Sequence, residues 1–336
     1  MPMSRPARAI PGRTLLARAL AAGLFTLAGA APLAAQDAWP NRAIRFIVPF
    51  APGGSNDFTA RLMAPRMAAR LGQQVVIETR SGAGGITGVD VAAKAPPDGY
   101  TVALGTAGGV VIGPLMAARP PFDPTRDLAA LTLAINVQVP VAVPGASPFR
   151  TMRDLIEAAR ANPGRVTYGS SGAGGLPHLA GELIRIAAGV EMVHVPYRGG
   201  APLALAVLSA EVNSGLSDLP VFMPHLASGH IRILAVGAPQ RMAILPNVPT
   251  LAEVGIPNIE TNNWHGLVTA AAVPTASLDR LHAAAFAALS DPDVTRLITD
   301  QGMEAAPTSR ADFTALIARE QTRWRGAIQA AGIRPE

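Results

Sequence analysis

The sequence predicts an α/β protein with two lobes, each built around a small parallel sheet flanked by helices. Short apolar strands alternate with helical segments, which is the order of parallel βαβ units. The order βαβαβ occurs twice along the chain. The chain is also long enough for two domains, with 336 residues of which 49% are hydrophobic.

The first βαβαβ unit contains three short strands followed by polar or glycine-rich loops, at 44–50, 75–79 and 100–106. Leu62, Met67 and Leu71 form one apolar stripe after the first loop and predict a helix, which Gly72 is suited to end. Pro65 falls within this stripe, so we expect a kink or break there. A second helix is expected to end near Ala95.

The second unit repeats this order at lower sequence similarity. Its strands are predicted at 165–169, 191–195 and 211–217. Helices are expected over 177–188 and 201–210. The two units therefore share the order of their elements and the placement of their glycine loops, while few of their residues are identical.

The remaining chain supplies connecting strands and closing helices. Alternation in the second half of 127–144 predicts a strand, as do the apolar runs at 231–237 and 261–274. Three amphipathic helices are expected near 275–289, 291–303 and 309–331. Thr275 or Ser277 is a candidate cap for the first of them, and Ser309 for the third. We therefore expect two lobes joined by more than one crossing strand.

The N-terminal residues 1–35 have the composition of a secretory signal peptide. Four arginines precede the uncharged apolar segment 19–31, and small residues follow it. This segment is too short to span a bilayer, which needs about 20 residues. We expect cleavage after Ala35 and export of a mature, periplasmic protein.

Composition excludes several classes of function. The chain has no cysteine, which rules out disulfides, thiol nucleophiles and iron–sulfur ligation. The net charge of +5 falls to +1 once residues 1–35 are removed, and no run of adjacent basic residues suits nucleic acid. GAGGIT (82–87) and GAGGLP (172–177) match only part of the dinucleotide fingerprint, and the histidines lack metal-site spacing. We expect no cofactor, no metal and no nucleic-acid partner.

The glycine-rich loops are the candidate binding elements. A loop between a strand and a helix exposes backbone N–H groups beside the positive end of the helix dipole, so it binds anions without a cationic side chain. Ser55 and Asn56 in the first unit, and Ser170 and Ser171 in the second, can add hydrogen bonds. Two facing loops suit a ligand with acidic groups. Tight-turn glycines with serine helix caps are the purely structural alternative.

A secreted serine hydrolase is the competing hypothesis from another class. Ser171 stands between a predicted strand and a helix, and Asp218 and His265 follow in the chain order of an α/β-hydrolase triad. The elbow motif is half present, because Ala173 replaces its second glycine.

Five motifs together resemble the Bug-type extracytoplasmic solute receptors, the binding proteins of tripartite tricarboxylate transporters. They are WPNRAIRFIVPFAPGGSND (39–57), PPDGYT (96–101), YGSSGAGGLPHLAGE (168–182), HVPYRGG (194–200) and LPNVPTLAEVG (245–255). The resemblance covers essentially the whole mature chain. It implies a type II-like periplasmic-binding-protein fold, with a mixed sheet in each lobe and a ligand cleft between the lobes.

The resemblance also implies which residues bind the ligand. Carried over motif by motif, and joined with the loop residues above, the candidates are Gly53, Gly54, Ser55, Asn56, Asp57, Thr106, Ala107, Ser170, Ser171, Gly172, Gly174, His178 and Asp218. His178 either contacts the ligand or supports its loop. Gly175 stands where the family usually has a hydroxyl residue, and Ala210-Glu211 where it has Gly-Gln, which leaves the ligand's identity open.

We therefore expect a monomeric, non-enzymatic periplasmic receptor. It would capture a small di- or tricarboxylate or an aromatic acid and deliver it to the membrane permease subunits of the transporter. A receptor that signals to a partner protein is a further alternative. Lobe 1 is expected over 36–130 and 245–336, and lobe 2 over 131–244.

Overall fold

The computed structural model describes residues 1–3 and 39–333. Contacts divide the chain into residues 1–41 and a compact unit from Arg42 onward. The described residues of the first part lie outside helices and strands, and the expected signal peptide lies almost wholly outside the described residues. None of the described helices combines the length and apolarity needed to cross a membrane.

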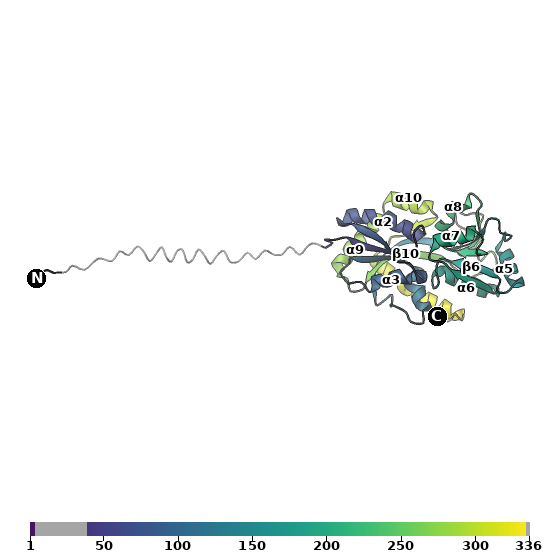
Figure 1. The fold of residues 1–336 in the computed structure, drawn as a ribbon, viewed down its shortest axis with the longest axis horizontal. Coiled ribbons are helices and arrows are strands. Elements are labelled where there is room, and N and C mark those ends of the chain that lie inside the picture. Colours follow the sequence, from purple (N-terminus) through teal and green to yellow (C-terminus); the bar gives the residue numbers. More distant parts are fainter. Residues whose placement is uncertain (4–38, 334–336) are drawn as a thin grey trace. The chain divides into compact units, whose positions relative to one another are not determined.

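Two mixed sheets organise the described part of the compact unit (Figure 1). The larger sheet has the order β11–β4–β10–β3–β1–β2, and the smaller has the order β7–β6–β8–β5–β9. The strands of the larger sheet are β1 (Ile44–Val48), β2 (Val75–Thr79), β3 (Thr101–Thr106), β4 (Leu128–Gln138), β10 (Asn262–Ala270) and β11 (Met303–Ala305). Those of the smaller sheet are β5 (Pro140–Pro144), β6 (Val166–Ser170), β7 (Met192–Pro196), β8 (Ser214–Leu216) and β9 (Ile231–Val236).

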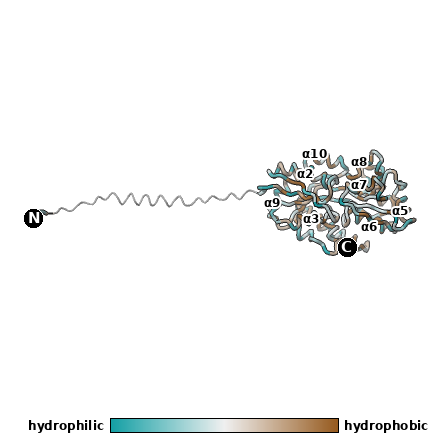
Figure 2. The backbone as a smooth tube through the Cα atoms, in the orientation of Figure 1, coloured by the Kyte–Doolittle hydropathy of each residue, from teal (hydrophilic) through white to brown (hydrophobic). Residues whose placement is uncertain are grey.

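Helices cover both sheets, and we call each sheet with its helices a lobe. Lobe 1 contains α2 (Ser55–Leu71), α3 (Ile86–Ala93), α4 (Gly113–Met116), α9 (Thr275–Leu289), α10 (Pro292–Asp300), α11 (Arg310–Ala330), the short turn η1 (Ala83–Gly85) and the π-helical turn η2 (Gly108–Ile112). Lobe 2 contains α5 (Met152–Ala161), α6 (Leu176–Ala188), α7 (Gly200–Leu208), η3 (Leu219–Val221) and α8 (Met223–Leu226). Hydrophobic stretches of the chain run between the labelled helices (Figure 2).

Both predicted βαβαβ units are confirmed. β1 pairs in parallel with β2 and β3, and β6 pairs in parallel with β7 and β8. Strands from outside the units, among them β10 beside β3 and β5 beside β8, add antiparallel pairs. The strand β3 is buried along its whole length, on both faces of the sheet, and its middle residues 102–104 are apolar.

The helix boundaries confirm some predictions and correct others. Gly72 ends α2 in the left-handed conformation, and the Ser309 side chain caps α11 by accepting from the Asp312 N–H. We expected a kink or a break at Pro65: α2 continues through it, which rules out the break, and the kink stays a prediction. The caps predicted for α9 are also wrong: Pro274, which has no side-chain acceptor, precedes the helix.

Two segments are shorter than the apolar pattern predicted. The strand expected over 211–217 is reduced to β8, because Glu211 donates its N–H to Ala206 and belongs to the turn that ends α7. The helix expected over 291–303 ends at Asp300, and the short strand β11 follows it against β4. The end of this helix is set by the pairing of β11 with β4, which is distant in the sequence, so the local periodicity does not predict it.

The chain crosses between the sheets at two adjacent places. Val139 connects β4 to β5, and the segment 237–261 connects β9 to β10. Thr261 joins these crossings, because its hydroxyl donates to the Val139 carbonyl at 2.8 Å and accepts from the Gly237 N–H at 3.1 Å. Where the lobes divide stays a prediction, and we propose that the divisions follow the sheets, with the first at Val139 and not between residues 130 and 131.

Candidate functional site

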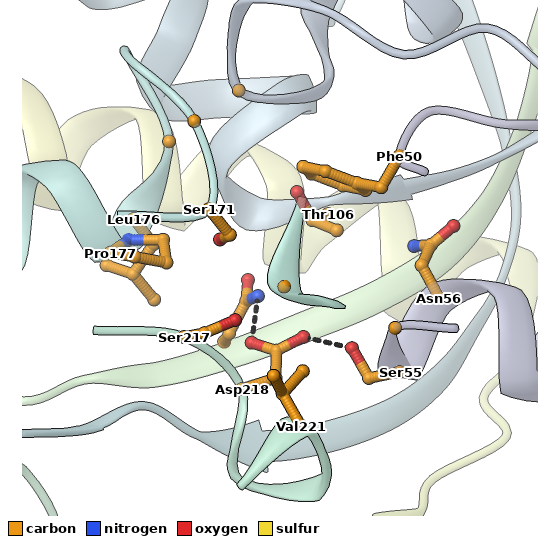
Figure 3. A pocket seen from close by; sticks show the side chains of 16 residues that line it. Phe50, Ser55, Asn56, Thr106, Ser171, Leu176, Pro177, Ser217, Asp218 and Val221 are labelled. Atoms are coloured by element: carbon orange, nitrogen blue, oxygen red, sulfur yellow. Dashed lines mark hydrogen bonds between the residues drawn. The ribbon is translucent and has the colours of Figure 1, made fainter. Parts of the chain in front are cut away.

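A small cavity lies where loops of both lobes meet (Figure 3). Its lining comprises Phe50, Gly54, Ser55, Asn56, Gly84, Thr106 and Asn263 from lobe 1, and Ser171, Gly172, Gly175, Leu176, Pro177, Gly200, Ser217, Asp218 and Val221 from lobe 2. The cavity has a volume of about 20 Å³, which is room for little more than one water molecule. A ligand of several carbons therefore requires the lobes to separate, or side chains to move.

Three helices begin at this cavity. They are α2 from lobe 1 and α6 and α7 from lobe 2, preceded by Gly54, Gly175 and Gly199. None of these three glycines supplies a side-chain cap to its helix. The N–H groups of the first turns and the positive ends of three helix dipoles thus converge on the cavity, an environment that stabilises an anion.

Seven of the sequence-predicted residues line the cavity: Gly54, Ser55, Asn56, Thr106, Ser171, Gly172 and Asp218. Six do not: Gly53, Asp57, Ala107, Ser170, Gly174 and His178. Most of the second group support the loops. Gly53 donates its N–H to the Asp57 carboxylate at 3.1 Å, and Arg61 holds the same carboxylate from the next turn of α2. Ala107 is fully buried where η2 begins.

His178 and Ser170 shape the loop between β6 and α6. His178 Nδ1 accepts from the Gly174 N–H at 3.2 Å, and its ring stacks on His194 with centroids 3.9 Å apart. The Ser170 hydroxyl donates to the Gly172 carbonyl and lies 2.7 Å from His194 Nε2. Burial, with a contribution from His178, lowers the pKa of His194 to about 4.

Nine lining residues were missed by the sequence reasoning. Gly84 and Gly200 follow strands in glycine-rich loops, so the argument used for PGGSND could have found them. Gly175 was noted only as a departure from the family pattern. Phe50, Leu176, Pro177 and Val221 are apolar residues on different sides of the cavity, and Ser217 and Asn263 complete the set. Nothing in their local sequence distinguishes these six from ordinary core and loop residues.

Asp218 lies at the centre of a hydrogen-bond network across the lobes. Its Oδ2 accepts from the Ser55 hydroxyl and lies 3.0 Å from His265 Nε2. Its Oδ1 accepts from Asn263 Nδ2 at 2.9 Å. Burial alone would raise the pKa of Asp218, but the hydrogen bonds and charge interaction from His265, with the bonds from Asn263 and Ser55, lower it below its ordinary value. The carboxylate is therefore ionised.

The hydrolase triad is not assembled. Asp218 and His265 are adjacent as that hypothesis required. Among the hydrogen bonds of the described residues, however, none joins Ser171 to His265, and the second ring nitrogen of His265 lies 3.4 Å from Asn56 Nδ2. Ser55, the serine that reaches this pair, donates directly to the carboxylate. A nucleophilic serine needs a hydrogen bond to the base, and this arrangement lacks one.

The two lobes touch closely around the cavity. A Cβ added to Gly84 of lobe 1 would lie 2.5 Å from the Gly175 nitrogen of lobe 2, and one added to Gly108 would lie 2.9 Å from the Gly175 Cα. The Ala51 N–H also donates to the Arg198 carbonyl across the same boundary at 3.2 Å. The structure is therefore a closed conformation.

No group of three or more histidine or acidic side chains in the described part of the chain is placed to hold a metal ion. Two lobes joined by paired crossings, with helix N-termini facing a cavity between them, define a two-lobed solute-binding protein. The comparisons with known proteins assign it more narrowly. Residues 59–333 match the model of the tripartite tricarboxylate transporter family receptor, and the chain belongs to this family.

Relatives and solved structures agree with this assignment. The chain is 30% identical over 314 residues to the protein BugT of Bordetella pertussis, covering 93% of this chain and 96% of BugT. The structure of Rpa4515 from R. palustris with adipate has a TM-score of 0.84 at 34% identity, covering 89% of this chain and all of that one. MatC from Rhodopseudomonas palustris with bound malate has a TM-score of 0.82 at 26% identity, covering 86% of this chain and all of that one. The predicted family and fold class are confirmed.

Proposed function

We propose that this protein is a periplasmic receptor that captures a small carboxylate between its lobes and delivers it to the permease subunits of a tripartite transporter. The observation that carries the proposal is the convergence of three uncapped helix N-termini, from both lobes, on one cavity. Family membership and relatives solved with adipate and malate support it. The sensing alternative stays a prediction.

Export to the periplasm is part of this proposal and rests on the pattern of residues 1–35. Expressed in a Gram-negative host, the protein recovered from the periplasm should begin near Gln36. An intact mass that retains Met1 in that fraction would contradict export by cleavage.

The binding test starts from protein stripped of ligand by unfolding and refolding. A thermal-shift screen of mono-, di- and tricarboxylates should identify a stabilising ligand, with a gain of about 2.7 kcal/mol at 100 times its dissociation constant. Ser171→Ala should reduce the binding free energy of that ligand by about 1.5–3 kcal/mol, the usual value of a hydrogen bond to a charged group. Ser228→Ala, which changes an exposed serine outside the cavity, is the matched control.

The same variants separate binding from hydrolysis. The parent protein should show no ester cleavage above buffer, because Ser171 has no hydrogen-bonded base. Ester cleavage that disappears in Ser171→Ala would overturn the receptor proposal, as would a response to sugars or cations with none to any carboxylate.

A further inference from the structure

A second cavity lies within lobe 1, between the helix α11 and the strands β4 and β10, and we call it the α11 cavity. Its apolar lining residues are Leu133, Trp264, Phe313 and Leu316. It has a volume of about 260 Å³, against about 20 Å³ for the cavity between the lobes. A cavity of about 150 Å³ is enough to hold benzene, so the α11 cavity has room for a small ligand without any movement of the lobes.

The α11 cavity is separate from the cavity between the lobes. Asn263 lines the interlobe cavity and Trp264 lines the α11 cavity, and the two are consecutive residues of β10. Successive side chains of a strand point to opposite faces, so Trp264 points away from the interlobe cavity. Among the described residues, none lines both cavities.

The lining of the α11 cavity contains hydrogen-bond donors without partners. Trp264 is 2% exposed, and its buried indole N–H has no hydrogen-bond partner. Arg319 lines the cavity from the exposed side of α11. No hydrogen bond or ion pair found among the described residues engages its guanidinium group. Buried donors are normally satisfied, so a ligand that fits this cavity should supply acceptors.

The acidic residues beside the cavity are already engaged. Glu320 accepts at both oxygens, from Trp324 Nε1 at 2.7 Å and from Arg323 at 3.4 Å. Asp312 accepts at 2.6 Å from the serine hydroxyl that caps α11. Arg319 is therefore left to pair with a negatively charged ligand.

We propose that the α11 cavity is a second binding site, for a small carboxylate with an apolar body. Arg319 binds the carboxylate, since a guanidinium group pairs with a carboxylate through two parallel N–H donors. The Trp264 N–H donates to the ligand, and Phe313 and Leu316 contact its apolar body. This site goes beyond the proposed function and does not depend on it.

The test uses benzoate as the probe and the indole N–H resonance of Trp264 as the readout, in proton–nitrogen correlation spectra of labelled protein. The chain has three tryptophans, and Trp264→Phe assigns the resonance by removing it. Benzoate should shift this resonance downfield and saturably, more than those of the other two tryptophans, because the N–H gains an acceptor. Benzamide, which lacks the charge, and acetate, which lacks the ring, should each bind at least tenfold more weakly.

Variants then assign the binding to Arg319. Arg319→Gln should weaken benzoate at least tenfold, the loss expected for one hydrogen bond between charged groups. Arg325→Gln is the matched control, because it changes another exposed arginine of α11 that lies outside the cavity lining, and it should leave the affinity unchanged. Gly54→Val places a side chain in the interlobe cavity, and it should also leave the response of Trp264 unchanged.

Three results would overturn the proposal. One is a Trp264 resonance that does not respond to benzoate. Another is equal affinity of Arg319→Gln and Arg325→Gln. The third is a response that disappears in Gly54→Val, which would place benzoate between the lobes. Each of these leaves the receptor proposal intact, because that proposal is tested at Ser171 in the other cavity.

Discussion

Closure of the lobes depends on a glycine that has no room for a side chain. Gly84 has φ +60°, and an added Cβ would lie 2.5 Å from the Gly175 nitrogen and 2.6 Å from the Ala173 carbonyl oxygen, both backbone atoms of lobe 2. Carbon atoms make their best contacts at about 3.5–4.0 Å, so Gly84→Ala requires these loops to separate by about 1 Å. We expect this variant to hinder closure.

The magnitude follows from the hydrogen bonds that span the same boundary. His265 and Asn263 lie 3.0 and 2.9 Å from Asp218, so a shift of about 1 Å brings such bonds beyond their usual range. Loss of one bond to a charged group costs about 1.5–3 kcal/mol. Gly84→Ala should therefore weaken ligand binding at least tenfold, since tenfold corresponds to about 1.4 kcal/mol.

Gly189→Ala is the matched control. Gly189 ends α6 with φ +61°, nearly the value at Gly84, but an added Cβ would meet no heavy atom within 4 Å. Both variants should lose about 1–2 kcal/mol of stability from the left-handed conformation. Only Gly84→Ala should bind the ligand more weakly, as measured by calorimetry. With ligand present, it should also keep a larger radius of gyration in X-ray scattering than the Gly189→Ala variant. Equal affinities of the two variants would refute this account of closure.

Two further predictions concern the cavity and its supporting loop. Gly54→Val should abolish the thermal shift with ligand, because its Cβ lies in open space and the rest of its side chain would occupy a cavity with room for little more than one water molecule. A retained shift would place the ligand elsewhere. Burial lowers the folded-state pKa of His194 to about 4 from its ordinary value of 6.5. Between these values the unfolded chain binds a proton that the folded chain excludes, so stability should fall as the pH drops through this window. His194→Gln should flatten the decline in melting temperature, and the exposed His230→Gln should not; equal slopes in all three proteins would contradict the assignment.

The parallel strands and the loops after them could be predicted from the sequence, because both depend on local chemistry. A short apolar run such as 75–79 is a strand wherever it is buried, and the glycines that follow it permit the turn into a helix. The carboxyl ends of parallel strands share one edge of a sheet, so Gly54, Ser55 and Ser171 were correctly expected near a common place. Gly84 obeys the same rule and could have been included.

The rest of the site depends on contacts that the local pattern does not contain. Asn263 reaches the cavity because β10 pairs antiparallel with β3 and β4, across the middle of the larger sheet. Phe50, Pro177 and Val221 are apolar residues that any core could hold, and only the approach of the lobes brings them around one cavity. The helix α2 continues through Pro65 for the same reason: it packs against α9, and the local sequence does not contain this contact.

Asp218 shows why chain order alone is a weak guide to the role of a residue. It lies in lobe 2, while Ser55, Asn263 and His265 lie in lobe 1. In a hydrolase the aspartate would orient a histidine toward a nucleophile, but here it accepts three donors from across the cleft. This hydrogen-bond network is complete only when the lobes are closed, since lobe 2 supplies the carboxylate and lobe 1 supplies its donors. The contacts of Asp218 and the closure of the lobes therefore depend on each other.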